Sequence, residues 1–296
     1  MTEEIFKLSD RRRQLSYASY GPETGRPVLY FHGTPSSRLE VLLLNNYGIN
    51  LEQMLHDAGL RLIAVDRPGM GFSTYNRKGN FLSFADDTKE LLDHLGIASC
   101  AVMCWSGGGP YALAMAHRHP SSITVVHILC GFTRKFGRDV TRLMGLNKFY
   151  FFAARYTPFL LRTALFILAR KKIRGSVPQK FTGLPYEDYT LLKDPRDLDA
   201  VATMTMKQAC RFGSKGAIHE ARNYYRDFGF DVSEVRQPVH YWWGTKDMTV
   251  IRLHAETIEQ HAPGGTMHYR EREGHLSLYV NYFHDVLQVI SQQYPS

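Results

Sequence analysis

Cysteine is scarce in this sequence. The four cysteines among 296 residues form no C-x-x-C pair and follow no regular spacing, which excludes a disulfide framework and a zinc ribbon. Cys100, Cys104 and Cys130 fall within expected buried strands, which favours reduced thiols and a cytoplasmic protein. The pair His117 and His119 is typical of a solvated helix end, so we expect no metal site.

Long apolar runs are also absent. No stretch approaches the roughly 20 apolar residues that a membrane-spanning helix needs. The start of the chain, Met1–Lys7, is charged and has no apolar core, so we expect no secretory signal. Repeats and low-complexity linkers are missing too. With 44% hydrophobic and 22% charged residues, the composition is that of an ordinary globular protein.

What is present is an alternation of apolar runs with helical patterns. Strands are expected at residues 13–20, 27–31, 60–65, 100–105 and 123–129, then at 238–243 and 266–272. Helices are expected at 50–58, 84–95, from residue 110, at 158–170, 251–261 and 276–292. Continuous apolar strands separated by helices predict an α/β fold, a mostly parallel sheet with helices on both faces.

The alternation stops for about a hundred residues. Residues 132–234 show helix and loop patterns with few strand signals. We therefore expect residues 1–131 and 235–296 to form one α/β core, and residues 132–234 to be a helical cap inserted into it.

A single polar residue marks the centre of the core. Between an apolar strand and an Ala-rich helix lies Ser106, followed by three glycines. A sharp strand-to-helix turn would project its hydroxyl, and the amide of Gly107 would lie at a helix N-terminus, where N–H groups stabilise an anion. This geometry suits a nucleophilic serine. Cys104 replaces the first glycine of the usual G-x-S-x-G pattern, which matters only if that position needs a positive φ.

Two further polar residues follow strands farther along the chain, Asp247 and then His275. A serine nucleophile needs a base to take its proton, and histidine suits that role near neutral pH. A carboxylate then holds the other ring nitrogen. Because the carboxyl ends of parallel strands share one edge of the sheet, the three side chains are expected to meet there.

The chain resembles the α/β-hydrolase superfamily. The matching motifs cover about two thirds of the chain, and they are His32–Arg38, Asp66–Ser73, Trp105–Pro110, Gly244–Asp247 and Gly274–His275. The resemblance implies Ser106 as nucleophile, Asp247 as acid and His275 as base. It also implies an oxyanion hole formed by the backbone N–H groups of Thr34 and Gly107, and no cofactor.

Some subfamilies are excluded by single residues. Haloalkane dehalogenases and epoxide hydrolases carry Asp where this chain has Ser106, and the oxyanion loop differs from the His-Gly-Gly-Pro-Gly of proline iminopeptidases. Asp66 and Arg67 are expected to shape their turn, and His32 to make an internal hydrogen bond. We expect a serine hydrolase that acts on carboxylic esters or related acyl compounds. Two alternatives stay open, a ligand-binding receptor or signalling module with slow turnover, and a hydrolase of lactones or C–C bonds.

Positive charge gathers in the expected cap. Residues 132–182 contain twelve Lys and Arg but one acid, Asp139, so this segment carries +11 while the rest of the chain sums to −3. Its apolar residues are expected to cover the active site, giving an apolar acyl pocket with a positive mouth. The alternative is an interfacial helix that contacts anionic lipid. No nucleic-acid motif accompanies the charge, and no pattern specifies an oligomeric state.

Overall fold

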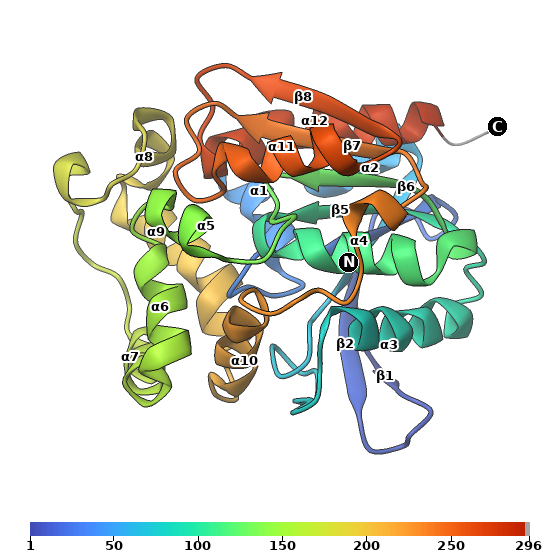
Figure 1. Ribbon diagram of the computed structural model, residues 1–296, viewed down its shortest axis with the longest axis horizontal. Coiled ribbons are helices and arrows are strands. Elements are labelled where there is room, and N and C mark those ends of the chain that lie inside the picture. The colour runs from blue at the N-terminus through green and yellow to red at the C-terminus, as the bar shows by residue number, and fades with distance from the viewer. Residues whose placement is uncertain (294–296) are drawn as a thin grey trace.

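The computed structural model describes residues 1–293, except for the side chain of Phe181. Its centre is a single eight-stranded sheet with the order β1-β2-β4-β3-β5-β6-β7-β8 (Figure 1). The strands are β1 Thr2–Lys7, β2 Gln14–Tyr20, β3 Arg26–Phe31, β4 Leu60–Val65, β5 Cys100–Trp105, β6 Ile123–Leu129, β7 Val239–Gly244 and β8 Gly265–Arg270.

The sheet is parallel from β4 through β8, and β1 and β2 run antiparallel at one edge. Every residue of β5 is buried, as expected for a central strand covered on both faces. Strand β1 was not expected from the sequence. It is an exposed, charged edge strand with only Phe6 partly covered, so it carries no buried apolar run that would reveal it.

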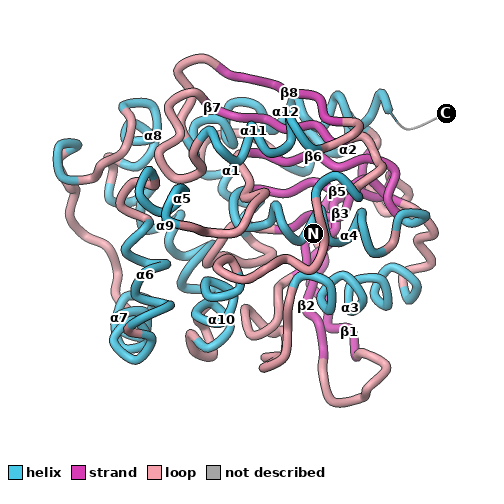
Figure 2. The backbone as a smooth tube through the Cα atoms, viewed as in Figure 1, coloured by secondary structure: helices cyan, strands magenta, loops and turns pink. Residues whose placement is uncertain are grey.

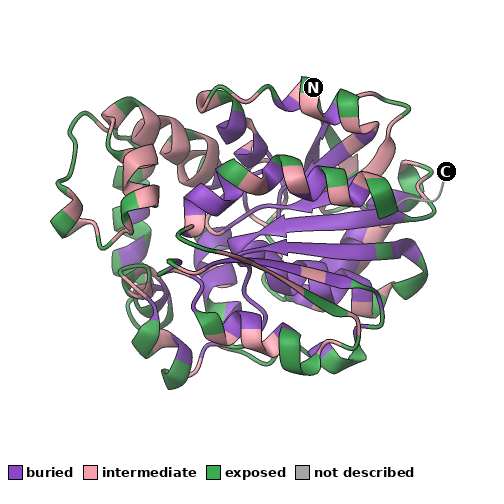
Figure 3. Ribbon diagram, turned by 90° about the horizontal axis from the view of Figure 1, so that it is seen from above, coloured by how far each residue is buried: buried purple, intermediate pink, exposed green. Residues whose placement is uncertain are grey.

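Helices cover both faces of the sheet. Helices α2 and α12 pack together on one face, whereas α3, α4 and α11 lie on the other (Figures 1 and 3). The helices of this part are α1 Leu43–Asn46, α2 Leu51–Ala58, α3 Phe81–His94, α4 Gly109–Arg118, α11 Arg252–His261 and α12 His275–Gln293. The α/β architecture predicted from the sequence is confirmed.

Between β6 and β7 the chain leaves the sheet and forms only helices and loops (Figure 2). The helices are α5 Arg138–Leu143, α6 Lys148–Tyr156, α7 Pro158–Arg170, α8 Tyr186–Leu192, α9 Pro195–Ala202 and α10 Lys215–Asn223, and a π-helical stretch, Thr203–Lys207, follows α9. Residues 132–234 are called the cap segment below.

Two buried histidines, His254 and His127, pack in the core. His254 on α11 accepts the backbone N–H of Thr133 at Nδ1, at 3.1 Å. His127 on β6 stacks on His240 of β7, with ring centroids 4.6 Å apart. Burial lowers the pKa of both His127 and His254 to about 3, so the folded protein holds both rings neutral.

We therefore expect acid to destabilise the fold. Unfolded histidines bind a proton below a pH of about 6.5, whereas His127 and His254 do not until about pH 3, so the free energy of unfolding falls between these limits. Each histidine contributes up to about 1.4 kcal/mol per pH unit. Urea unfolding at pH 7, 6 and 5 measures the slope. His254→Asn should flatten it and the exposed His56→Asn should not, and equal slopes in His254→Asn and the parent would contradict the assignment.

Candidate active site

The turn after β5 holds Ser106 in a left-handed conformation, with φ of +53°. A 3-10 turn, Ser106–Gly108, leads directly into α4. Glycine is required here, because a Cβ on Gly108 would lie 2.3 Å from the carbonyl oxygen of Phe31, and one on Gly107 would lie 2.6 Å from Thr34 Cγ2. Positive φ at a non-glycine residue is strained, and such strain gathers at functional sites.

The residue that departs from the G-x-S-x-G pattern, Cys104, has ordinary backbone geometry. Cys104 is fully buried, and it is not among the described residues with a positive φ. The site of a Cβ on Gly108 lies only 2.9 Å from Cys104 Cβ. Position 104 therefore does not need glycine. A small side chain is sufficient there, and cysteine provides one.

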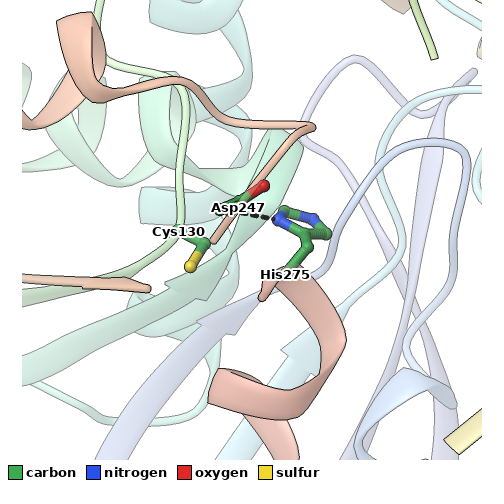
Figure 4. Close-up of side chains that lie close together, drawn as sticks. All are labelled: Cys130, Asp247 and His275. Atoms are coloured by element: carbon green, nitrogen blue, oxygen red, sulfur yellow. Dashed lines mark hydrogen bonds and ion pairs between the residues drawn. The ribbon is translucent and has the colours of Figure 1, made fainter. Parts of the chain in front are cut away.

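Asp247 and His275 form a direct pair, although 28 residues separate them. His275 Nδ1 lies 2.7 Å from Asp247 Oδ2 (Figure 4). The other carboxylate oxygen, Oδ1, accepts the backbone N–H groups of Thr249 and Val250 at 2.7 and 2.8 Å. Asp247 is thus fixed in the loop after β7, with one oxygen aimed at the imidazole ring.

Electrostatics favour protonation of His275. Its burial lowers the pKa, but the charge of Asp247 and its hydrogen bond, together with the charge of Asp188, outweigh this effect and raise the pKa above its usual 6.5. A histidine in this setting is poised to gain a proton and to share the resulting charge with Asp247.

Trp105 contacts His275 and holds it next to the turn that carries Ser106. The rings of Trp105 and His275 stack with centroids 5.0 Å apart, and the indole Nε1 donates a hydrogen bond to the His275 carbonyl oxygen at 3.2 Å. Because Ser106 directly follows Trp105, these contacts place the imidazole beside the serine turn. The structure thus joins Asp247 and His275 directly, and connects them to Ser106 through Trp105.

The loop after β3 carries the predicted oxyanion donor Thr34, and its side chain lies against Gly107. Glu40 fixes this loop by accepting the Gly33 N–H, with its two oxygens 2.9 and 2.8 Å away. Burial raises the pKa of Glu40 to about 7. In the part of the chain that the structure describes, the N–H groups of Thr34 and Gly107 donate to no protein acceptor, which leaves both available to a ligand.

Arg67 holds the same loop from the other side. Its guanidinium donates to the carbonyl oxygens of His32 and of Gly33, the latter at 2.6 Å. The imidazole of His32 bonds internally to the Gly33 carbonyl at 2.8 Å, as expected from the sequence. Arg67 was expected only to shape its own turn, but its bonds show that it also positions the oxyanion loop.

Two carboxylates of the cap segment contact the oxyanion loop and the start of α12. On α10, Glu220 accepts from Arg67 Nε and from the Thr34 hydroxyl. On α8, Asp188 accepts the backbone N–H groups of His275, Leu276 and Ser277 at 2.8, 3.0 and 2.8 Å, so it caps the helix that begins at the catalytic candidate His275. Sequence reasoning missed both acids, because nothing local distinguishes them from surface carboxylates.

One cluster of three side chains could in principle hold a metal. Among the described residues, Cys130, Asp247 and His275 bring ligand atoms within 4.8 Å of one another (Figure 4). However, Asp247 and His275 already bind each other at 2.7 Å. Burial also raises the pKa of the Cys130 thiol well above its usual value, which opposes the thiolate that a metal requires. The donor set therefore fits a hydrogen-bonded pair better than a metal site.

Comparison with known proteins identifies the family. A family model described as the alpha/beta hydrolase fold matches residues 26–282. The chain belongs to the α/β-hydrolase family. An uncharacterised hydrolase of Bacillus subtilis, YcgS, is 24% identical over 254 residues, which cover 85% of each chain. The protein is thus a hydrolase of the α/β fold.

Solved structures agree with the fold. A carboxylesterase structure from the thaumarchaeon Nitrososphaera gargenis superposes with a TM-score of 0.70 at 19% identity, over 98% of this chain and all of that one. The esterase RhEst1 from Rhodococcus sp. ECU1013 gives a TM-score of 0.67 at 20% identity, over 99% of both chains. At these identities the similarity establishes the shared fold.

Asp188 offers a test of the link between the cap segment and His275. Asp188→Asn removes a negative charge near the imidazole and one of the acceptors at the start of α12. We expect kcat to fall by several-fold to about tenfold, and the acid limb of the pH profile of kcat/KM to move to lower pH, because Asp188 raises the pKa of His275. Its neighbour Glu187→Gln is the matched control. An unshifted acid limb in Asp188→Asn would contradict this role.

Proposed function

We propose that the protein is a serine hydrolase that cleaves carboxylic esters or related acyl compounds through an acyl-enzyme on Ser106. The observation that carries the proposal is the strained Ser106 turn, with φ of +53°, beside an imidazole that stacks on Trp105 and binds Asp247. The esterases among the structural neighbours support the same class of reaction.

The first half of the reaction follows from these positions. Ser106 Oγ attacks the carbonyl carbon while His275 Nε2 takes the hydroxyl proton. The imidazolium shares its Nδ1 hydrogen with Asp247 Oδ2. Negative charge develops on the carbonyl oxygen and is stabilised by the N–H groups of Thr34 and Gly107, each worth about 3 kcal/mol in the transition state. The imidazolium then protonates the leaving alcohol, which departs from the acyl-enzyme.

The second half repeats these roles with water. His275 removes a proton from the water molecule, which attacks the acyl carbon, and the proton passes to Ser106 Oγ as the acid leaves. Because His275 must be neutral to act as a base and its pKa lies above 6.5, kcat/KM should rise with pH through a region above 6.5.

The cap segment shields this site. Ser106 is only 6% exposed, and the Tyr224 hydroxyl, from the end of the cap segment, donates to the Gly107 carbonyl oxygen at 2.8 Å. Excluding water strengthens the interactions of a developing oxyanion with its donors. All four cysteines are free and buried, which supports the cytoplasm as the location of the protein.

Replacement of the nucleophile tests the proposal. Ser106→Ala should abolish labelling by fluorophosphonate and lower ester hydrolysis by several powers of ten, without loss of the thermal unfolding transition. In the parent protein the best small ester should turn over at more than roughly 1 s⁻¹, near the low end of ordinary enzymes.

Two results would count against an esterase. Labelling that survives Ser106→Ala and maps to another serine would remove the proposed nucleophile. Turnover of only a few molecules per hour across many esters and lactones, with small ligands still raising Tm, would favour a receptor.

Replacement of the acid gives a second, independent test. Asp247→Asn should lower kcat by about 10⁴-fold. The N–H groups of Thr249 and Val250 hold the amide oxygen at the Oδ1 position, so the NH2 group faces Nδ1 of His275. Its donation to Nδ1 leaves the ring hydrogen on Nε2, and the imidazole then cannot take the serine proton. Asp139→Asn, an exposed acid of the cap segment that pairs with Arg134, should leave kcat within about twofold. The opposite ranking, measured with a single ester substrate, would show that the catalytic carboxylate lies elsewhere.

A further inference from the structure

The cap segment exposes an unusually large set of apolar side chains. Phe159 is 81% exposed, Leu160 71% and Phe149 61%. Seven more large apolar side chains between residues 143 and 168 are exposed, and they are Leu143, Leu146, Phe152, Tyr156, Phe166, Ile167 and Leu168. The expectation that these residues cover the active site is therefore wrong. Exposed apolar side chains gathered in one segment in this way indicate an interaction site.

Eight of these side chains lie on two adjacent helices at one end of the molecule, α6 and α7 (Figure 1). Leu143 ends α5, and Leu146 lies in the loop before α6. On α6, Phe149, Phe152 and Tyr156 are spaced by three and four residues, so they share one face. On α7, Phe159 and Phe166 are two turns apart. Each helix buries little, and the buried residues of the two are Phe151, Ala154, Leu161 and Leu165. We call the exposed part of residues 143–168 the apolar face.

Cations lie within and next to the apolar face. Arg155, Arg162 and Arg170 interrupt its apolar residues and are all exposed. In the part of the chain that the structure describes, no ion pair involves any Lys or Arg between residues 142 and 174, which are Arg142, Lys148, Arg155, Arg162, Arg170, Lys171, Lys172 and Arg174. A surface with this composition attracts an anionic partner and also needs an apolar one.

We infer that the apolar face and its cations bind the surface of an anionic phospholipid bilayer. Helices α6 and α7 would lie in the plane of the interface, with Phe159 and Leu160 among the upper acyl chains and the arginines at the headgroups. None of the described helices is long and apolar enough to cross a bilayer, so the contact is with one leaflet.

Other occupants match the surface less well. A second copy of the chain would cover the apolar residues but would bring two segments of charge +11 face to face. A nucleic acid or an acidic protein would pair with the cations, but its charged groups would not cover the side chains of Phe159 and Leu160. An anionic bilayer satisfies both requirements at once.

The bound helices would be connected to the candidate active site. On α6, the Tyr150 hydroxyl donates to the Ala217 carbonyl oxygen of α10 at 3.1 Å. Helix α10 carries Glu220, which holds Thr34 and Arg67 of the oxyanion region. Bilayer binding itself does not depend on the proposed esterase activity, because no residue of the apolar face takes part in the chemistry.

Co-sedimentation of the full chain with vesicles tests the inference. Vesicles of phosphatidylcholine alone are compared with vesicles that contain roughly one third phosphatidylserine. We expect binding at least about tenfold tighter to the anionic vesicles and weakened by salt. Ser106→Ala should bind like the parent, so this experiment and the esterase assays fail or succeed separately.

Matched variants separate the contribution of the apolar side chains to vesicle binding from that of the cations. Phe159→Ser with Leu160→Ser should weaken binding at least tenfold, and Ile5→Ser, which is 53% exposed on β1, should not. Changing Arg170, Lys171 and Lys172 to Gln should weaken binding about a hundredfold, or about 1 kcal/mol per charge. As a control, changing Lys7, Arg11 and Arg12 to Gln removes the same number of charges and should change vesicle binding little.

Several outcomes would overturn the inference. They are equal binding to neutral and anionic vesicles, no binding to either, and binding that survives in the Phe159 and Leu160 variant. A dimer seen by sedimentation velocity without lipid, and dissociated by the same two substitutions, would assign the apolar face to a second copy instead. Binding to DNA or polyglutamate that is unchanged by these substitutions, without vesicle binding, would assign the cations to a polyanion.

Discussion

The arrangement of the site depends on one buried ion pair. Arg67 from the turn after β4 meets Glu220 from α10, and both side chains are almost completely buried. The remaining donors of Arg67 hold the carbonyl groups of His32 and Gly33, and Glu220 also accepts from Thr34. Removing either partner would leave a charge uncompensated in the interior, which costs several kcal/mol. The pair therefore couples the oxyanion loop to the cap segment.

A second carboxylate acts in the same way at the histidine. Asp188 satisfies three N–H groups at the start of α12 that would otherwise lack partners. Its charge also adds to that of Asp247 in raising the pKa of His275. The cap segment thus contributes to both halves of the proposed machinery, the base and the oxyanion donors. Two acids of this strongly cationic segment, Asp188 and Glu220, are therefore buried against the site.

The two sides of the cap segment differ in chemistry. Toward the core it presents carboxylates and tyrosine hydroxyls, and toward solvent it presents aromatic and aliphatic side chains among unpaired cations. Such an outer surface has no evident role in the stability of the fold, because α7 buries only Leu161 and Leu165. Its composition is better explained by a partner than by folding.

Much of the core could be predicted from the sequence alone. Seven of the eight strands were predicted, and five of them follow from apolar runs, because a buried strand in a parallel sheet must be apolar along its length. The other two, β2 and β8, gave weaker signals, and β8 has no fully buried residue. Ser106, Asp247 and His275 follow from their places after strands. Only tertiary structure could reveal Asp188, Glu220 and the further role of Arg67, since their hydrogen-bond partners lie far away in the chain. The direction of the apolar residues on α6 and α7 was likewise decided by packing. A helical pattern shows which residues share a face, but only the neighbours of the helix determine whether that face meets the core or the solvent.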